Sequence, residues 1–107
     1  LGQLVFILQR GVRFPQGPPF MNYCVYILIN INGKSNPTYV GYTNDISNRL
    51  KLHNSSRGAK FTRGRIWKII YKKYYKSKST AMQNEYKIKH NVKQRAIIKS
   101  NYLKKIN

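Results

Sequence analysis

The segment between residues 23 and 53 constrains the fold more than any other part of this chain. Residues 23–30 form an apolar run rich in β-branched and aromatic side chains, a composition typical of a β-strand. The turn signal Asn32-Gly33 follows, and residues 38–43 resume the strand pattern. Two such runs around a short turn predict a β-hairpin. Because residues 23–30 are apolar on both faces, we expect a central strand with helices on each side.

A capped helix is predicted directly after the hairpin. Asp45 follows a Thr-Asn pair, and residues of these types cap helix N-termini. Four residues share one helical face because they follow the spacing i, i+3, i+4, i+7: Ile46, Arg49, Leu50 and His53. Arg49 and His53 therefore flank an apolar stripe that must pack against the hairpin.

The rest of the chain predicts a third strand and two helices. Residues 57–65, with two glycines and four basic residues, read as a loop, and a strand follows over residues 66–71 or as far as residue 75. N-cap chemistry at residues 77–80 opens a helix to about residue 90, and a basic helix follows over residues 92–102. Three residues of this last helix are expected to pack on the body: Val92, Ala96 and Ile97. The order strand-strand-helix-strand-helix-helix predicts a mixed α/β domain of the α+β type, with a small central three-stranded antiparallel sheet flanked by helices.

Residues 1–20 do not resemble the remainder of the chain. The apolar run at residues 4–8 is too short for a transmembrane helix or a typical signal-peptide core. The proline- and glycine-containing residues 10–20 cannot propagate a helix or strand. We interpret residues 1–20 as a leader or flexible arm, with an added strand over residues 4–8 as the alternative, and residues 21–107 as one domain.

Charge indicates the kind of partner. The chain holds 21 Lys and Arg against 2 Asp and Glu, a formal net charge of +19, while 41% hydrophobic residues favour a folded protein. Such a charge predicts a polyanionic partner, and nucleic acid is the first candidate. An acidic membrane is disfavoured because the basic residues are interleaved with β-type segments. The single cysteine, Cys24, excludes an internal disulfide and a cysteine-based zinc cluster.

The two carboxylates of the chain have different settings. Asp45 lies at a helix start, where a structural capping role is expected. Glu85 shares a helical face with Ala81, Met82 and Ile88, which we expect to be buried. A buried carboxylate needs a paired charge or a cation. An ion pair with a Lys or Arg and a divalent-metal site are therefore both open for Glu85.

Several motifs, taken in order, resemble those of the GIY-YIG nuclease domain. Residues 24–26, Cys-Val-Tyr, resemble its first motif, and residues 39–41, Tyr-Val-Gly, resemble its second. Three single residues complete the ordered set: Arg49, His53 and Glu85. Residues 58–63 resemble a segment found in the compact single-domain branch of the family. The resemblance covers about residues 22–90.

Two positions depart from the family pattern. Cys24 and Val25 replace the Gly-Ile of the first motif, a mild change because the tyrosine is kept. Many members also carry an asparagine some way after the glutamate, and Ile97 lies near the expected place here. Asn91 and Asn101 fit that spacing poorly.

The resemblance implies a metal-dependent endonuclease that hydrolyses DNA phosphodiester bonds, with one Mg²⁺ or Mn²⁺ ion as its cofactor. Ordinary duplex, branched, nicked and flap DNA all stay open as substrates, and the branch implies a place in DNA repair. The implied roles are Tyr39 as general base on the attacking water, Tyr26 holding that water or the phosphate, Gly41 allowing close backbone approach, Arg49 stabilising phosphate charge, His53 assisting near the phosphate or leaving group, and Glu85 holding the metal. A tyrosine base needs its anion to be favoured, and Arg49, the metal and the positive field all act in that direction.

Three basic loop residues are expected to contact DNA phosphates: Lys60, Arg63 and Arg65. The alternative function is a catalytically silent basic nucleic-acid-binding module. A basic structural protein would leave the set of Tyr26, Tyr39, Arg49 and Glu85 unexplained. We expect a monomer that acts inside the cell, in the cytoplasm, nucleus or nucleoid, with DNA as partner, no membrane and no small-molecule cofactor.

Overall fold

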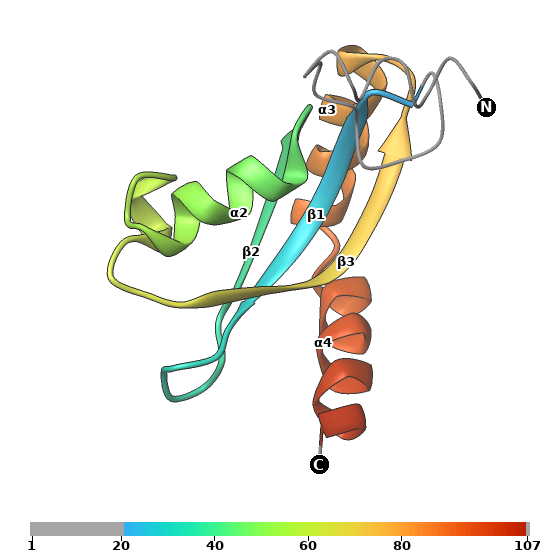
Figure 1. The fold of residues 1–107 in the computed structure, drawn as a ribbon. Helices are drawn as coiled ribbons and strands as arrows, with labels where there is room; N and C mark the ends of the chain where they lie inside the picture. Colours follow the sequence, from blue (N-terminus) through green and yellow to red (C-terminus); the bar gives the residue numbers. More distant parts are fainter. Residues whose placement is uncertain (1–20, 107) are drawn as a thin grey trace, which may run out of the picture.

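The computed structural model describes residues 21–106, so the expectations for residues 1–20 lie outside the described residues. Three strands form one antiparallel sheet in the order β2-β1-β3 (Figure 1). Their bounds are β1 Tyr23–Asn30, β2 Thr38–Thr43 and β3 Trp67–Tyr75. The predicted α+β fold, its central three-stranded sheet and its order of elements are confirmed.

The central strand β1 divides its side chains between the two faces of the sheet. Seven of its eight residues are buried, as its continuous apolar run predicts. Because side chains alternate along a strand, Tyr26 lies on one face while Val25 and Ile27 lie on the other. The face that receives Tyr26 is also the face on which Tyr39 of β2 packs.

Helix α2 (Ile46–Asn54) covers the face that carries Tyr26 (Figure 1). Its N-cap is Asp45, whose carboxylate accepts a hydrogen bond from the Asn48 amide at 3.2 Å, in agreement with the predicted capping role. The chain then forms a short 3₁₀ turn, η1 (Lys60–Thr62), inside the segment predicted as a plain loop. The structure thus adds an ordered turn next to α2.

Helices α3 (Lys78–Lys89) and α4 (Val92–Ile106) follow β3. Ser77 caps α3 by accepting a hydrogen bond from the Thr80 amide at 3.1 Å. Ala81 and Ile88 of α3 are buried against the sheet face opposite α2. Figure 1 shows α4 continuing beyond α3 towards the C-terminus.

The expected packing of α4 is wrong in its helical phase. Val92, Ala96 and Ile97 are exposed, with 68% of Val92 and 55% of Ile97 accessible to solvent. Ile98 packs on the apolar cluster instead. The face of α4 that packs on the sheet therefore includes Ile98, one residue after the expected Ile97. Within residues 21–106, no helix has both the length and the apolar character that a membrane span requires.

Candidate active site

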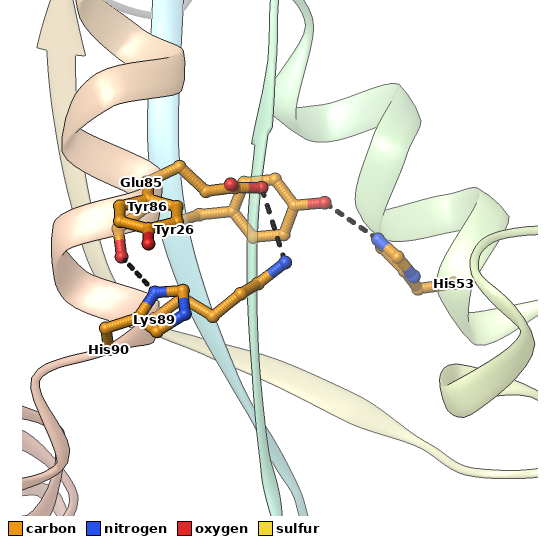
Figure 2. Close-up of polar contacts among 6 residues, drawn as sticks. All are labelled: Tyr26, His53, Glu85, Tyr86, Lys89 and His90. Carbon is orange, nitrogen blue, oxygen red and sulfur yellow. Dashed lines mark hydrogen bonds and ion pairs between the residues drawn. The ribbon is translucent and has the colours of Figure 1, made fainter.

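Tyr26 lies at the centre of the site, in the middle of β1 and only 1% exposed. Its hydroxyl lies 2.8 Å from Nε2 of His53 on α2 (Figure 2). The helical spacing that places His53 on the inner face of α2 therefore brings it onto the tyrosine of the first motif. The two side chains are 27 residues apart in sequence and form one buried hydrogen-bonded pair.

Gly41 makes room for this pair. It lies directly across from Tyr26 on β2, and a Cβ atom at this position would lie 2.6 Å from the Tyr26 hydroxyl oxygen. That distance is too short for any side chain, so the position requires glycine as long as the phenol stays in place. The group that approaches the backbone of Gly41 closely is thus the Tyr26 ring.

The His53 ring is fixed from both sides. The Thr62 hydroxyl donates its only hydrogen to the Ala59 carbonyl at 2.8 Å, so its oxygen must accept from Nδ1–H of His53 at 2.9 Å. Nε2 is then the unprotonated nitrogen, and the Tyr26 hydroxyl donates to it. Burial, and after it the charge of Arg49, lowers the pKa of His53 to about 4, which keeps the ring neutral.

Thr62 and Gly58 belong to this arrangement and were missed by the sequence analysis. Thr62 is fully buried, and a Cβ atom on Gly58 would lie 2.5 Å from Nδ1 of His53. The available signal was the resemblance of residues 58–63 to a family segment, which assigned no role to either residue. That segment has no periodicity, and its partner His53 lies on a different element.

Tyr39 is partly buried at the edge strand β2, within a cluster of rings. Its ring centroid lies 5.1 Å from His53 and 6.5 Å from Tyr26. On its other sides it meets Phe61 at 6.4 Å and Trp67 at 6.5 Å. The two motif tyrosines therefore lie side by side on one face of the sheet, and Tyr39 is the more exposed of the two.

Burial dominates the electrostatics of both tyrosines. It raises the pKa of Tyr26 to about 12, and Arg49 nearby lowers that value only in part. Burial also raises the pKa of Tyr39, where Arg49 acts in the lowering direction and Glu85 in the raising direction. Arg49 thus acts on both tyrosines in the expected lowering direction, but burial outweighs it in the protein alone.

Arg49 has unused hydrogen-bonding capacity at this point. It is partly buried on α2, and its Nε atom is shielded from solvent without a hydrogen-bond partner among residues 21–106. A buried donor without a partner costs stability unless a ligand supplies the acceptor. An anionic oxygen is the acceptor that suits a guanidinium best.

Glu85 lies on α3, which packs on the sheet face opposite α2. Its side chain is 20% exposed and lies 3.9 Å from Nζ of Lys89, a long ion pair drawn in Figure 2. The predicted stripe is buried at Ala81 and Ile88, but Met82 is 46% exposed. Because Glu85 raises the pKa of Tyr39, its carboxylate lies within electrostatic reach of the tyrosine cluster.

The donor set suits one hard divalent cation and no larger centre. Residues 21–106 contain no group of three or more His, Cys, Asp and Glu residues that could hold a metal together. The other carboxylate, Asp45, is engaged at the start of α2. Mg²⁺ is commonly bound through one or two carboxylates, with water and substrate phosphate oxygens completing its shell. A partly exposed Glu85 fits that mode.

The three basic loop residues lie on the η1 turn or directly after it. Lys60 and Arg63 are exposed, while Arg65 is partly buried. The guanidinium carbon of Arg65 lies 5.0 Å from the centroid of the Phe61 ring. Through Phe61, which also meets Tyr39, the basic loop is continuous with the candidate site.

Comparisons with known proteins extend the resemblance over most of the chain. The family description that matches residues 22–100 is the GIY-YIG catalytic domain. A UPF0213 protein of Oceanobacillus iheyensis is 46% identical over 66 residues, which span 61% of this chain and 73% of the relative. A UPF0213 protein of Clostridium perfringens is 38% identical over 96 residues, which span 81% of this chain and 99% of the relative. No solved structure matches the chain.

Proposed function

The chain belongs to the GIY-YIG catalytic domain family, which implies a nuclease-type function, and from this premise we propose that it is a divalent-metal-dependent endonuclease acting on DNA. The formal charge of +19 supports a polyanionic substrate. A DNA-cleaving enzyme works where DNA is present, so we place it inside the cell. We further propose that residues 21–107 suffice for the activity.

The observation that carries this proposal is that the two motif tyrosines, Tyr26 and Tyr39, lie 6.5 Å apart on one face of the sheet, near a guanidinium, Arg49, whose buried Nε has no partner among residues 21–106. Arg49 on α2 lowers the pKa of Tyr39 and Glu85 on α3 raises it, and the two helices cover opposite faces of the sheet. A guanidinium, a carboxylate and a tyrosine are the parts a phosphodiesterase needs: a phosphate-binding cation, a metal ligand and a group that can exchange a proton.

In the proposed mechanism Tyr39 accepts a proton from the attacking water. It suits that part better than Tyr26 because it is the more exposed of the two. The hydroxyl of Tyr26 donates its proton to His53, so towards the same water its oxygen can act only as a hydrogen-bond acceptor that orients it. Arg49 stabilises the negative charge that grows on the phosphate.

We assign His53 a positioning part in place of the expected contact with the phosphate or leaving group. Its ring is fully buried, and both nitrogens already have protein partners. It does not ionise Tyr26 in the free protein. Burial raises the pKa of Tyr26 and lowers that of His53, and both changes oppose transfer of the phenol proton to the imidazole.

Glu85 is the residue that would hold the metal ion. A bound divalent cation would supply positive charge to the phosphate and would reverse the anionic influence of Glu85 that raises the pKa of Tyr39. The substrate would have to complete the coordination shell, so metal affinity should be weak without DNA. We therefore expect the protein to remain inactive until both the metal ion and DNA are bound.

The proposal is tested by cleavage of end-labelled linear, nicked, branched and single-stranded DNA, with and without Mg²⁺. The parent should cut at least one substrate only with the metal. Tyr39→Phe should lower the cleavage rate about 10²- to 10⁴-fold with little change in DNA affinity, because only the exchangeable proton is lost. Binding of the whole panel without any metal-dependent cleavage would support the alternative, a catalytically silent nucleic-acid-binding module.

A further inference from the structure

Phe61 is an exposed aromatic side chain at the edge of the proposed active site. It is 49% exposed, although its ring lies 6.4 Å from that of Tyr39 with only 18° between the two planes. The buried Trp67 lies behind it at 6.0 Å. The Phe61 ring therefore continues the tyrosine cluster outwards and presents aromatic surface to solvent.

The surroundings of this ring are cationic. Arg65 places its guanidinium carbon 5.0 Å from the ring centroid, and the sequence neighbours Lys60 and Arg63 are exposed. Single exposed apolar residues are common on proteins and need no explanation by themselves. Phe61 differs because it adjoins the proposed general base, Tyr39, and pairs with a cation. Aromatic faces together with guanidinium groups are what unstacked nucleic-acid bases bind.

The position of Phe61 is tied to the catalytic centre by the η1 turn. The Thr62 amide donates to the Ala59 carbonyl at 3.0 Å, which closes the turn around Phe61. The next side chain, Thr62, holds the His53 ring, which in turn accepts from Tyr26. The turn that supplies the partner of His53 thus also carries the exposed ring, which places Phe61 next to the buried pair in the chain.

We propose that Phe61 and Arg65 form a stacking platform for one unpaired base beside the phosphate that is cut. The proposal rests on the nuclease function above and deepens it, because it names single-stranded or locally unpaired DNA as the preferred substrate. A base inside a duplex has both faces covered by its neighbours and would first have to leave the stack, which costs a few kcal/mol. An unpaired base reaches the platform without this cost.

The platform can be tested by binding alone, with metal removed by a chelator. Trp67 is the only tryptophan of the chain and lies next to Phe61, so its fluorescence reports a base at this position. The probes are a short single-stranded thymidine oligonucleotide and the same strand with abasic sugars at its centre. The parent should bind the thymidine strand about 5- to 150-fold more tightly, the range expected for stacking of one base.

Three variants make the result specific. Phe61→Leu should bind both strands with the affinity that the parent has for the abasic strand, because leucine keeps apolar contact with Trp67 but lacks an aromatic face. Phe61→Tyr should retain the preference. Tyr86→Leu removes another exposed aromatic ring, 63% accessible on α3, and should leave the preference unchanged. Equal affinity of the parent for the two strands, or a preference that survives in Phe61→Leu, would overturn the platform.

A cleavage arm separates this inference from the proposed function. With Mg²⁺, the parent should cut single-stranded DNA faster than the matched duplex, and Phe61→Leu should lose most of that difference. Equal cleavage of both, abolished by Tyr39→Phe, would refute the platform and leave the nuclease intact. Base-dependent binding without cleavage of either DNA would support the platform and refute the nuclease.

Discussion

On one face of the sheet, β1 packs Val25 and Ile27 against α3 in a cluster whose buried members are all apolar. On the other face the same strand points Tyr26 at α2, where the neighbouring buried groups include the polar side chains His53 and Thr62. Both faces exclude water to a similar degree. They differ in whether the buried groups need hydrogen bonds.

The contrast shows that one central strand can support non-directional apolar packing on one face and directed hydrogen bonds on the other. Apolar burial against α3 is non-directional and contributes to folding wherever the shapes fit. On the α2 face every buried polar group needs its partner, and a missing one costs about 1–3 kcal/mol. That same burial raises the pKa of Tyr26 and lowers that of His53.

The largest effect on stability is expected from Ile27→Ala, on the α3 face. Ile27 is fully buried, so the truncation should lower the free energy of unfolding by about 2–5 kcal/mol. Cleavage per folded molecule should be unchanged, because the side chain points away from Tyr26. Ile97→Ala is the matched control: this isoleucine is 55% exposed and should change stability by at most about 0.5 kcal/mol. Urea unfolding of the parent and the two variants measures these changes in the free energy of unfolding. Comparable losses of stability in Ile27→Ala and Ile97→Ala would contradict the assigned faces.

Acid should weaken the α2 face through His53. The unfolded chain takes up a proton on this ring near pH 6.5, whereas the folded protein resists protonation until about pH 4. Unfolding is therefore coupled to proton uptake between these values, and the free energy of unfolding should fall by roughly 3 kcal/mol as the pH falls through this window.

The matched variants for this pH dependence are His53→Gln and His90→Gln. His53→Gln should flatten the dependence between pH 6.5 and pH 4, while His90→Gln, at an exposed position on the end of α3, should keep it. The measurement is thermal or urea unfolding across the pH range. A parental slope that persists in His53→Gln would show that another group causes the acid sensitivity.

A smaller effect, on the salt dependence of DNA binding, tests which face of the sheet the DNA contacts. If about six phosphates are neutralised, the logarithm of the binding constant should fall with the logarithm of salt concentration with a slope near −5. Arg63→Ala, beside the tyrosine cluster, should reduce the magnitude of that slope by about one unit. Lys93→Ala on α4 should reduce it less. The reverse order would place the DNA on the α3 and α4 side.

Local signals in the sequence were enough to predict most of the fold. The bounds expected for the first two strands, residues 23–30 and 38–43, are those observed. These elements are defined by β-type runs, a turn signal and capping residues that lie next to one another in the chain. The phase of α4 failed because Ile97 and Ile98 are equivalent locally, and only packing on the sheet distinguishes them.

The site was predictable to the extent that it follows from periodicity and motif. Arg49 and His53 share one helical face, and their convergence with Tyr26 and Tyr39 follows from that spacing. Thr62 and the direction of the tyrosine pKa values were not predictable in this way. Both depend on which side chains are buried together in the tertiary structure, whereas the sequence shows only which residues carry charge.

The most direct test of the proposed metal-dependent mechanism is whether Mg²⁺ still stimulates cleavage by the Glu85→Gln variant, with Asp45→Asn as control. The control alters the other carboxylate of the chain but keeps an amide oxygen that can cap α2. Mg²⁺-dependent cleavage and DNA affinity are measured for both variants and the parent. We predict that Glu85→Gln binds DNA yet shows no metal-stimulated cleavage, while Asp45→Asn cleaves like the parent. Metal-stimulated cleavage by Glu85→Gln would contradict the proposed nuclease mechanism.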